Sequence, residues 1–470
     1  MRILLPTGSS TYQLVRDAAA EIEADVVVTG EIASFLAPGQ LRDLLRGGKY
    51  DMAIVSGMCT ADFSAIERET GVPIFRGPRH AADLGFALPI AVAGGLSRSI
   101  PADEYLARQG KEEAYRKLSE RERMATPVYS IRSLKIGGGS RMKVLAEIMD
   151  AHRVGNLPLL VDRFFCDGAD IVDLGFGFDA TAQDVERCFR ALEDVDGPLS
   201  VDTQDAELLR AALFRADIVL SLQEENIPRV GEEVGNAGAA AVVVPGHTTL
   251  AYNVGLAREA GIECIIADPL LQPVGSGFAA SLAGFPGAVY PTFFGAGNVT
   301  ELLDADSIGM NALLAGIAHE LGASLIFTSE HSDKTRGSVA EMRRATEMMA
   351  ILGERPYPKD LGIDLLVLKE KRRRLEPPVQ CRERVPAIPM TDEIRYDPKG
   401  NFRIGIEHGM IIAEIRGKAI LGTRWGDILA TILKDGEVSL LDHAGYLGKE
   451  LYKAELALRY GRSFEQDGEF

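Results

Sequence analysis

The chain has 470 residues, of which 46% are hydrophobic, and a formal net charge of −17. This length exceeds the size at which one hydrophobic core keeps growing, so we expect two or three domains. The acidic balance argues against a nucleic-acid partner, because binding to phosphates depends on basic patches. No run of about 18 apolar residues is present, so we expect no membrane association. The five cysteines lack paired metal-ligand spacing, which fits a cytoplasmic protein that acts on small molecules.

Residues 1–100 alternate short apolar runs such as RILLP and DMAIVSG with helical patterns such as YQLVRDAAAEI. Repeated strand and helix patterns predict a doubly wound parallel sheet, of flavodoxin or Rossmann type. The loop PTGSST contains only one glycine, Gly8, so the dinucleotide fingerprint is missing. Residues 9–11 are more simply explained as helix caps. The polar cluster around Arg79 and His80 leaves both ligand binding and a structural role open.

Residues 101–140 form a predicted linker. Charged helix formers extend from Ala102 to Met124, and GGGS at residues 137–140 predicts a flexible joint. Residues 141–360 then contain eight apolar runs, most of them separated by an amphipathic helical pattern. Eight such units predict a (β/α)8 barrel. The runs begin at residues 142, 169, 198, 216, 239, 263, 288 and 324.

The last part of the chain predicts a connector and a small third domain. Residues 361–393 contain the basic stretch KEKRRR and several prolines. Residues 394–470 contain two strand patterns, FRIGIE and MIIAEIR, followed by two helical stretches. We therefore expect a small α+β domain after the barrel, and the charge run in the connector is more simply a solvated helix face than a binding patch.

Polar side chains follow almost every predicted barrel strand. In a (β/α)8 barrel the active site forms at the carboxyl ends of the strands. A rim rich in carboxylates suits a ligand with several N–H donors, and the 2-amino-4-oxo edge of a pterin offers two side by side. The residues at these ends are Glu147 and Asp150, Asp173, Asp202, Ser221 with Gln223, His247, Asp268, Asn298, and Glu330 with His331.

The stretch SVDTQDAELLRAAL shows how one of these residues is freed for a ligand. Asp202 could simply cap the following helix, but Thr203 is able to do so instead. We therefore expect Thr203 to start the helix and Asp202 to face the barrel mouth. Asp173 lies within its strand, and either a ligand contact or an interior structural partner fits that position.

The segment 142–344 resembles the pterin-binding barrel of dihydropteroate synthases and of cobalamin-linked methyltetrahydrofolate methyltransferases. GADIVDLG, SVDT and DPLLQPVGSGF carry this resemblance. The whole chain resembles the dihydropteroate synthase-like group of archaea and methylotrophs, through GNVTELLDADSIGMNALL and the closing HAGYLGKELYKAELAL. This resemblance implies a role in tetrahydromethanopterin and one-carbon metabolism, a pterin ligand and a homodimer.

The resemblance also implies roles for individual residues. Asp202 matches an aspartate near the pterin ring, and Asp268 matches the carboxylate that pairs with the ring edge. Asn298 matches the asparagine of the methyltransferase branch that lies near the pterin N5. Glu147 stands where synthases have an asparagine that ligates magnesium, so a Mg²⁺ cofactor is expected there. Ser221 replaces the usual asparagine after the fourth strand, and Gln223 follows it as a further pterin candidate.

Several synthase motifs are altered in this chain. MDAHRVGN stands in place of the threonine-proline-aspartate-serine-phenylalanine loop, and GNVTELL in place of serine-arginine-lysine. The final arginine-x-histidine is replaced by TSEHSDKTRG, which supplies His331, Lys334 and Arg336 as the candidates for holding a diphosphate. Three functions follow from the resemblance: a synthase-like transferase, a pterin-dependent methyltransferase with a corrinoid protein as partner, and a pterin-binding protein without catalysis.

Overall fold

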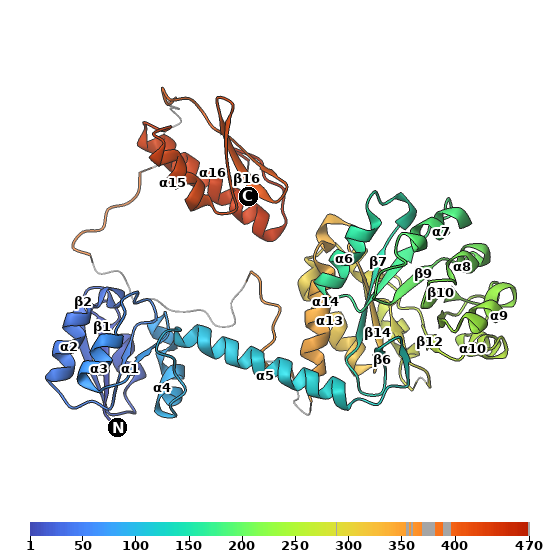
Figure 1. Ribbon diagram of the computed structural model, residues 1–470, viewed down its shortest axis with the longest axis horizontal. Helices are drawn as coiled ribbons and strands as arrows, with labels where there is room; N and C mark the ends of the chain where they lie inside the picture. Colours follow the sequence, from blue (N-terminus) through green and yellow to red (C-terminus); the bar gives the residue numbers. More distant parts are fainter. Residues whose placement is uncertain (288, 354–356, 359–360, 369–380, 389–395, 469–470) are drawn as a thin grey trace. The chain divides into compact units, whose positions relative to one another are not determined.

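A computed structural model describes residues 1–470 except 288, 354–356, 359–360, 369–380, 389–395 and 469–470 (Figure 1). The chain divides into two units, Met1–Gln380 and Cys381–Phe470, and each is described by itself. Most of the connector predicted at residues 361–393, including KEKRRR, lies outside the described residues. Among the described helices, none combines the length and apolar character that crossing a membrane requires.

The first unit begins with a four-stranded parallel sheet in the order β2-β1-β3-β4. Hydrophobic residues of β1 and β3 are buried between helices on both faces, as the doubly wound prediction requires. The strands are β1 (Ile3–Gly8), β2 (Ala24–Gly30), β3 (Met52–Val55) and β4 (Ile74–Arg76). The helices are α1 (Tyr12–Ala18), α2 (Pro38–Arg46), α3 (Ser64–Thr70) and α4 (Leu84–Val92), with 3-10 turns η1 (Ala33–Phe35) and η2 (Ala81–Asp83).

The start of α1 differs from the sequence prediction. Thr11 is the N-cap residue, but its side chain accepts no hydrogen bond from the helix. Its hydroxyl instead lies 2.9 Å from the hydroxyl of Thr7. The two threonines therefore hold the end of β1 against the start of α1.

The charged helix α5 (Ala102–Met124) leads to a short antiparallel hairpin, β5 (Tyr129–Ile131) and β6 (Leu134–Ile136). Apolar residues of this hairpin pack against the first residues of several barrel strands and close the amino-terminal end of the barrel. The Tyr129 hydroxyl donates to the carbonyl of Ile265 at 2.9 Å. The hairpin is missing from the sequence prediction, because each of its strands has only three residues.

The GGGS stretch, predicted as a flexible joint, is a packed turn. Gly137, Gly138 and Gly139 all have positive φ angles. A Cβ atom at Gly138 would lie 1.7 Å from the carbonyl oxygen of Thr126, whereas one at Gly139 would meet nothing within 4 Å. Glycine is needed at Gly138 because two backbone segments approach each other there.

Eight parallel strands form the predicted barrel, in the order β12-β11-β10-β9-β8-β7-β14-β13. A bridge between Ala267 and Thr292 joins the two end strands of this order. The prediction of a (β/α)8 barrel with an additional α/β domain and an α+β domain is confirmed. The barrel strands are β7 (Lys143–Ile148), β8 (Ile171–Gly175), β9 (Leu199–Asp202), β10 (Ile218–Leu222), β11 (Ala240–Val243), β12 (Ile265–Ala267), β13 (Phe293–Phe294) and β14 (Leu325–Ser329).

Helices cover the outside of the barrel, and one large apolar cluster joins them to the strands. This packing explains why the strands are continuous apolar runs that end on polar residues. The helices are α6 (Leu157–Asp167), α7 (Ala182–Arg190), α8 (Ala206–Ala212), α9 (Ile227–Ala237), α10 (Leu250–Glu259), α11 (Phe278–Ser281), α12 (Ala296–Glu301), α13 (Ser307–Glu320) and α14 (Ser338–Ala350). The 3-10 turns are η3 (Ala151–Arg153), η4 (Leu282–Gly284) and η5 (Asp333–Thr335).

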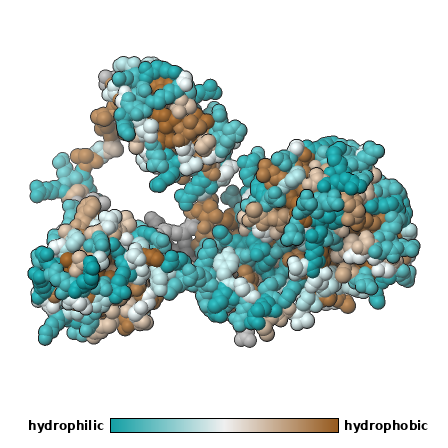
Figure 2. Space-filling model, in the orientation of Figure 1, coloured by the Kyte–Doolittle hydropathy of each residue, from teal (hydrophilic) through white to brown (hydrophobic). Residues whose placement is uncertain are grey.

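The second unit is an antiparallel three-stranded sheet with two helices. Its elements are β15 (Arg403–Glu407), β16 (Met410–Ile415), β17 (Lys418–Gly422), α15 (Trp425–Lys434) and α16 (Leu441–Tyr460). The sequence prediction has only two strands and misses β17, in which a single residue, Ile420, is buried. Figure 2 shows a hydrophobic patch on the visible face of this unit. The exposed hydrophobic side chains of the unit as a whole include Leu421, Leu433 and Leu441.

The turn between the hairpin and the barrel generates a stability prediction. Gly138→Ala adds a Cβ that collides with the Thr126 carbonyl, whereas Gly139→Ala meets open space. Both changes cost about 1 kcal/mol for a left-handed conformation. We expect Gly138→Ala to lower the free energy of unfolding by about 2 kcal/mol more than Gly139→Ala does, measured by denaturant titration. Equal stability of the two variants would contradict the close approach of the backbones.

Candidate functional site at the mouth of the barrel

Three carboxyl groups meet at the carboxyl ends of neighbouring barrel strands. Glu147 on β7 is in register with Asp173 on β8, and Asp173 is in register with Ser200 on β9. Alternate residues of a strand point to the same face, so Ser200 and Asp202 both face the barrel interior. Carboxylate oxygens of Glu147, Asp173 and Asp202 lie within 4.8 Å of one another.

Asp173 is the most deeply placed of the three, and its side chain is fully buried. One carboxylate oxygen, Oδ1, accepts a hydrogen bond of 2.5 Å from the Ser200 hydroxyl. The other, Oδ2, is buried and has no hydrogen-bond partner among the described residues. Burial, followed by the neighbouring carboxyls of Asp202 and Glu147, raises the pKa of Asp173 well above its usual value. This oxygen therefore requires a proton or a cation.

The other two carboxyls, of Glu147 and Asp202, also have raised pKa values. Burial raises the pKa of Glu147 to about 8, and the carboxyls of Asp202, Glu301 and Asp150 add to the shift. Burial also raises the pKa of Asp202 to about 6. The three groups cannot all be ionised near neutral pH without a compensating positive charge.

This donor set fits a divalent cation of the magnesium type. Mg²⁺ prefers oxygen ligands and commonly takes one or two carboxylates together with water and substrate phosphates. Three carboxylate residues converge here, and one buried oxygen is unpartnered. The residues that could hold the cation are therefore Glu147, Asp173 and Asp202, which adds two residues to the single ligand predicted from the sequence.

Asp268 forms the other side of the mouth, directly after β12. It is 7% exposed, and its Oδ1 accepts a hydrogen bond of 2.8 Å from the backbone N–H of Leu270. Burial raises the pKa of Asp268 to about 7, and the Asp202 carboxyl adds to this effect. The two predicted pterin-contacting aspartates thus lie close enough to influence each other electrostatically.

The helix after β9 begins later than the sequence predicts. Asp205 is the N-cap residue of α8, and its side chain accepts a hydrogen bond of 2.8 Å from the Glu207 N–H. Thr203 instead accepts a hydrogen bond of 3.3 Å from the Asp205 N–H. The prediction that Thr203 caps the helix is wrong, because a stronger capping residue follows two positions later. Asp202 is nevertheless free of a capping role, as expected.

The remaining pterin candidates, Ser221, Gln223 and Asn298, are not part of the carboxyl cluster. Ser221 is half-buried in β10, and its carbonyl accepts a hydrogen bond of 2.9 Å from the Asn226 side chain. The Gln223 N–H donates to the same side chain at 2.9 Å. Asn298 is exposed on α12, and its amide makes no hydrogen bond within the described part of the chain. Asn226 orders the loop after β10, a role that the sequence analysis did not assign.

The predicted diphosphate-binding residues lie on the loop after β14 and are paired with acids. Lys334 forms an ion pair of 3.0 Å with Asp304, and Arg336 forms one of 3.0 Å with Asp333. His331 is exposed, and its backbone N–H donates to Glu301 at 3.0 Å. The structure therefore places these three residues on one loop, but with protein partners for both cations.

Glu301 is a central residue that the sequence analysis missed. Its carboxylate accepts hydrogen bonds from the hydroxyls of Ser329, Ser332 and Thr335, at 3.0, 2.6 and 2.6 Å. Burial opposes ionisation of Glu301, but these hydrogen bonds outweigh it and hold its pKa below the usual value. Glu301 thus anchors the last loop as a carboxylate and also raises the pKa of Glu147. The sequence did contain a signal for Glu301, because it follows Asn298 by three residues and residues at that spacing share one face of a helix.

One curated relative matches this chain over nearly its whole length. The uncharacterized protein MJ0107 of Methanocaldococcus jannaschii is 32% identical over 522 residues, which cover 99% of this chain and 98% of the relative. The family model PterinBD-DUF4346 matches residues 396–467, in the second unit.

Solved structures that are similar to part of this chain include three dihydropteroate synthases. The enzyme of Yersinia pestis is 21% identical, with a TM-score of 0.36, covering 47% of this chain and 96% of that structure. The Xanthomonas albilineans enzyme is 21% identical, with a TM-score of 0.38, and the match covers 44% of this chain and 91% of that structure. The Thermus thermophilus enzyme is 19% identical, with a TM-score of 0.37, and the match covers 44% of this chain and 92% of that structure.

The identity with MJ0107 extends over nearly the full length of both chains. The chain therefore belongs to one family with MJ0107.

Proposed function

We propose that the protein is a transferase of the dihydropteroate synthase type, which joins a dihydropterin methyl diphosphate to an arylamine. We place this reaction in tetrahydromethanopterin synthesis. The observation that carries the proposal is the pair of buried carboxyls, Asp202 and Asp268, at the mouth of a closed barrel. Two recessed acceptors of this kind suit a ring whose edge presents adjacent N–H donors.

In this proposal Asp268 accepts hydrogen bonds from the ring N–H and the 2-amino group of the pterin. The Leu270 N–H already fixes the orientation of the Asp268 carboxylate. Hydrogen-bond donors on the ring favour the ionised carboxylate. Pterin binding therefore lowers the raised pKa of Asp268 and favours its ionised form. Asp202 faces the same space and holds the ring from the side of β9.

Glu147, Asp173 and Asp202 are the residues that would hold a divalent cation such as Mg²⁺. The cation would supply positive charge that compensates the three carboxylates and attracts the diphosphate of the substrate. Asp173 would contribute the oxygen that is unpartnered among the described residues, and Ser200 keeps that carboxylate in position.

The proposed step needs no nucleophile from the protein. The arylamine nitrogen attacks the exocyclic methylene carbon, the bond from this carbon to the diphosphate oxygen breaks, and the diphosphate leaves with the electron pair. The amine then loses one proton. Positioning of the two substrates is the main contribution of the barrel. Lys334 and Arg336 already pair with Asp304 and Asp333, which would compete with the diphosphate for them.

A second candidate is a pterin-dependent methyltransferase with a corrinoid protein as partner. The exposed Asn298 favours it, because its amide has no partner among the described residues and is available to a pterin N5. An acid at the position of Asp202 would then protonate N5 while the methyl group leaves. A pterin-binding protein without turnover is the remaining alternative.

Turnover assays separate these three functions. We expect purified protein to release diphosphate when it is incubated with the dihydropterin methyl diphosphate and an aminobenzene substrate, either p-aminobenzoate or a ribofuranosyl-aminobenzene phosphate. Absence of release with both amines would refute the synthase proposal. A change in cob(I)alamin absorbance with a methylated tetrahydropterin would then support the methyltransferase, and pterin binding without either signal would support the binding role.

Substitution of the two mouth aspartates tests the pterin site. Asp202→Asn and Asp268→Asn each replace an acceptor oxygen by a donor amide, and we expect each to weaken pterin binding by about 2 to 4 kcal/mol in calorimetric titration. Asp194→Asn, at an exposed position outside the mouth, is the matched control and keeps wild-type affinity. Unchanged affinity in both mouth variants would refute the site.

The carboxyl cluster predicts a pH-dependent response to Mg²⁺. Because the pKa of Glu147 is raised from 4.5 to about 8, its ionisation destabilises the metal-free fold progressively over that range. We expect the metal-free melting temperature to fall as pH rises through this window. Added Mg²⁺ should raise it more at about pH 8 than at about pH 6, because the cation binds the ionised form.

Glu147→Gln should reduce both the pH dependence and the stabilisation by Mg²⁺, and Glu193→Gln, at an exposed position, should change neither. The measurement is thermal unfolding after treatment with a chelator. An identical Mg²⁺ response of the wild type and Glu147→Gln would contradict the proposed cation site.

A further inference from the structure

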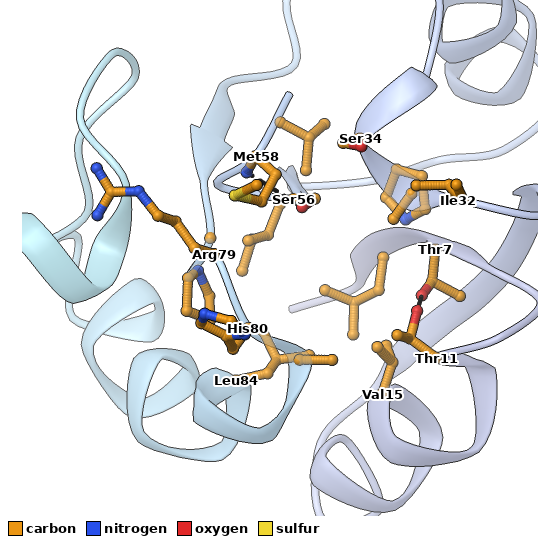
Figure 3. Close-up of a pocket in the computed structure, with 18 of the residues that line it drawn as sticks. Thr7, Thr11, Val15, Ile32, Ser34, Ser56, Met58, Arg79, His80 and Leu84 are labelled. Atoms are coloured by element: carbon orange, nitrogen blue, oxygen red, sulfur yellow. Dashed lines mark hydrogen bonds between the residues drawn. The ribbon is translucent and has the colours of Figure 1, made fainter. Parts of the chain in front are cut away.

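A second cavity lies in the N-terminal sheet, far along the chain from the barrel strands. In the strand order β2-β1-β3-β4, β2 lies on one side of β1, and β3 and β4 lie on the other side. The direction in which strands are added therefore reverses between β1 and β3. Ligands of doubly wound folds bind at such a reversal, outside the carboxyl ends of the strands. A cavity of about 280 Å³ is located there, lined by the ends of β1 and β3 and the loops after β2 and β4 (Figure 3).

The inner part of this cavity is lined by hydrocarbon side chains. Leu5, Ile54, Val15 and Leu84 all line it and are buried in the domain core. Two large apolar side chains at its opening remain exposed: Ile32 at 49% and Met58 at 54% (Figure 3). Exposed apolar surface around a concave opening is a common property of small-molecule sites, since a bound ligand covers it.

Neutral hydrogen-bonding groups are distributed among these apolar residues. Thr7 and Thr11 contribute hydroxyls that lie 2.9 Å apart, and the Ser56 hydroxyl accepts a hydrogen bond of 3.2 Å from the Met58 N–H. The half-buried Ser34 also lines the cavity, and its hydroxyl has no partner among the described residues. These groups can fix the orientation of a ring with polar atoms at its edge.

Two ionisable residues, Arg79 and His80, line the cavity. Among the described residues that line it there is no carboxylate. Arg79 is paired with Asp103 at 3.0 Å and with Glu104, and its guanidinium points away from the cavity in Figure 3. A pterin edge would find no carboxylate acceptor here, and a phosphate would find a guanidinium that is already neutralised.

The shape of the cavity is set by backbone packing. A Cβ atom at Gly8 would lie 2.4 Å from the Glu31 carbonyl oxygen, and one at Gly57 would lie 2.5 Å from the Gly77 carbonyl oxygen. The loop after β1 therefore packs closely on the loop after β2, and the loop after β3 on the loop after β4. The opening is held by main-chain contacts, so a ligand enters a site that is already formed.

We propose that this cavity binds a neutral aromatic compound of one or two fused rings, such as a heterocyclic base. The cavity volume of about 280 Å³ is just below the range of about 300 to 1,000 Å³ that is typical of small-molecule sites, which favours a small ligand. The site is independent of the pterin site in the barrel, because the two share no residue and differ in their charge.

Ligand-observed saturation-transfer NMR on the full chain tests this proposal with three probes: adenosine, indole and adenosine monophosphate. We expect saturation transfer to the ring protons of adenosine and indole, and no tighter binding of the monophosphate. Ser34→Leu fills the cavity without removing a hydrogen bond and should weaken both neutral probes at least about tenfold. Ser119→Leu, at an exposed position on α5, and Asp268→Asn, in the barrel, should leave this binding unchanged.

Thermal unfolding confirms that the variants are folded. If Ser34→Leu does not fold, Met58→Ala replaces it, because Met58 is half exposed, and Met124→Ala is its control. The proposal is overturned if neither neutral probe binds, if the cavity variants bind them as the wild type does, or if the monophosphate binds more tightly than adenosine by about tenfold or more.

Discussion

The repulsion among carboxyl groups in the barrel mouth is the constraint on which the candidate site depends. Glu147, Asp173, Asp202 and Asp268 are all placed where burial raises the pKa, and Asp202 and Glu147 raise the pKa of a neighbour further. Such an arrangement lowers the stability of the empty protein, because each ionised group has lost water without gaining a positively charged partner. A ligand rich in N–H donors, together with a cation, would remove that cost on binding. The same groups thus disfavour the empty site and favour the filled one.

The barrel tolerates this cost because its strands are otherwise almost wholly apolar. One cluster joins the strands to the outer helices, and a second fills the interior from the amino-terminal end. The four acids lie near the carboxyl ends of the strands, so each is carried by a rigid strand or by the first residue beyond it. Rigid support matters here, since carboxyls that could move apart would lose both their raised pKa values and their preference for a cation.

The sequence was sufficient for the barrel and for its four acids, because both depend on patterns that are local in the chain. Strands buried on both faces appear as apolar runs, and an acid at the end of a run marks the mouth. The close contact of Asp173 with Ser200 depends on the register between two strands, which a single strand does not contain. The pairing of Lys334 with Asp304 likewise joins residues 30 positions apart. Asp205, and not Thr203, caps the helix, and the sequence could not decide between them because two polar residues two positions apart offered the same local chemistry.

The hairpin β5–β6 changes how the chain can be divided. Its apolar residues form one cluster with the first residues of the barrel strands, and Tyr129 and Arg132 bond to the barrel at Ile265 and Asp217. A fragment that started at residue 141 would therefore leave the base of the barrel open to water. Proteolysis or gene truncation can release an intact barrel only if the cut falls before the hairpin, because this part of the segment that looks like a linker in the sequence closes the base of the barrel.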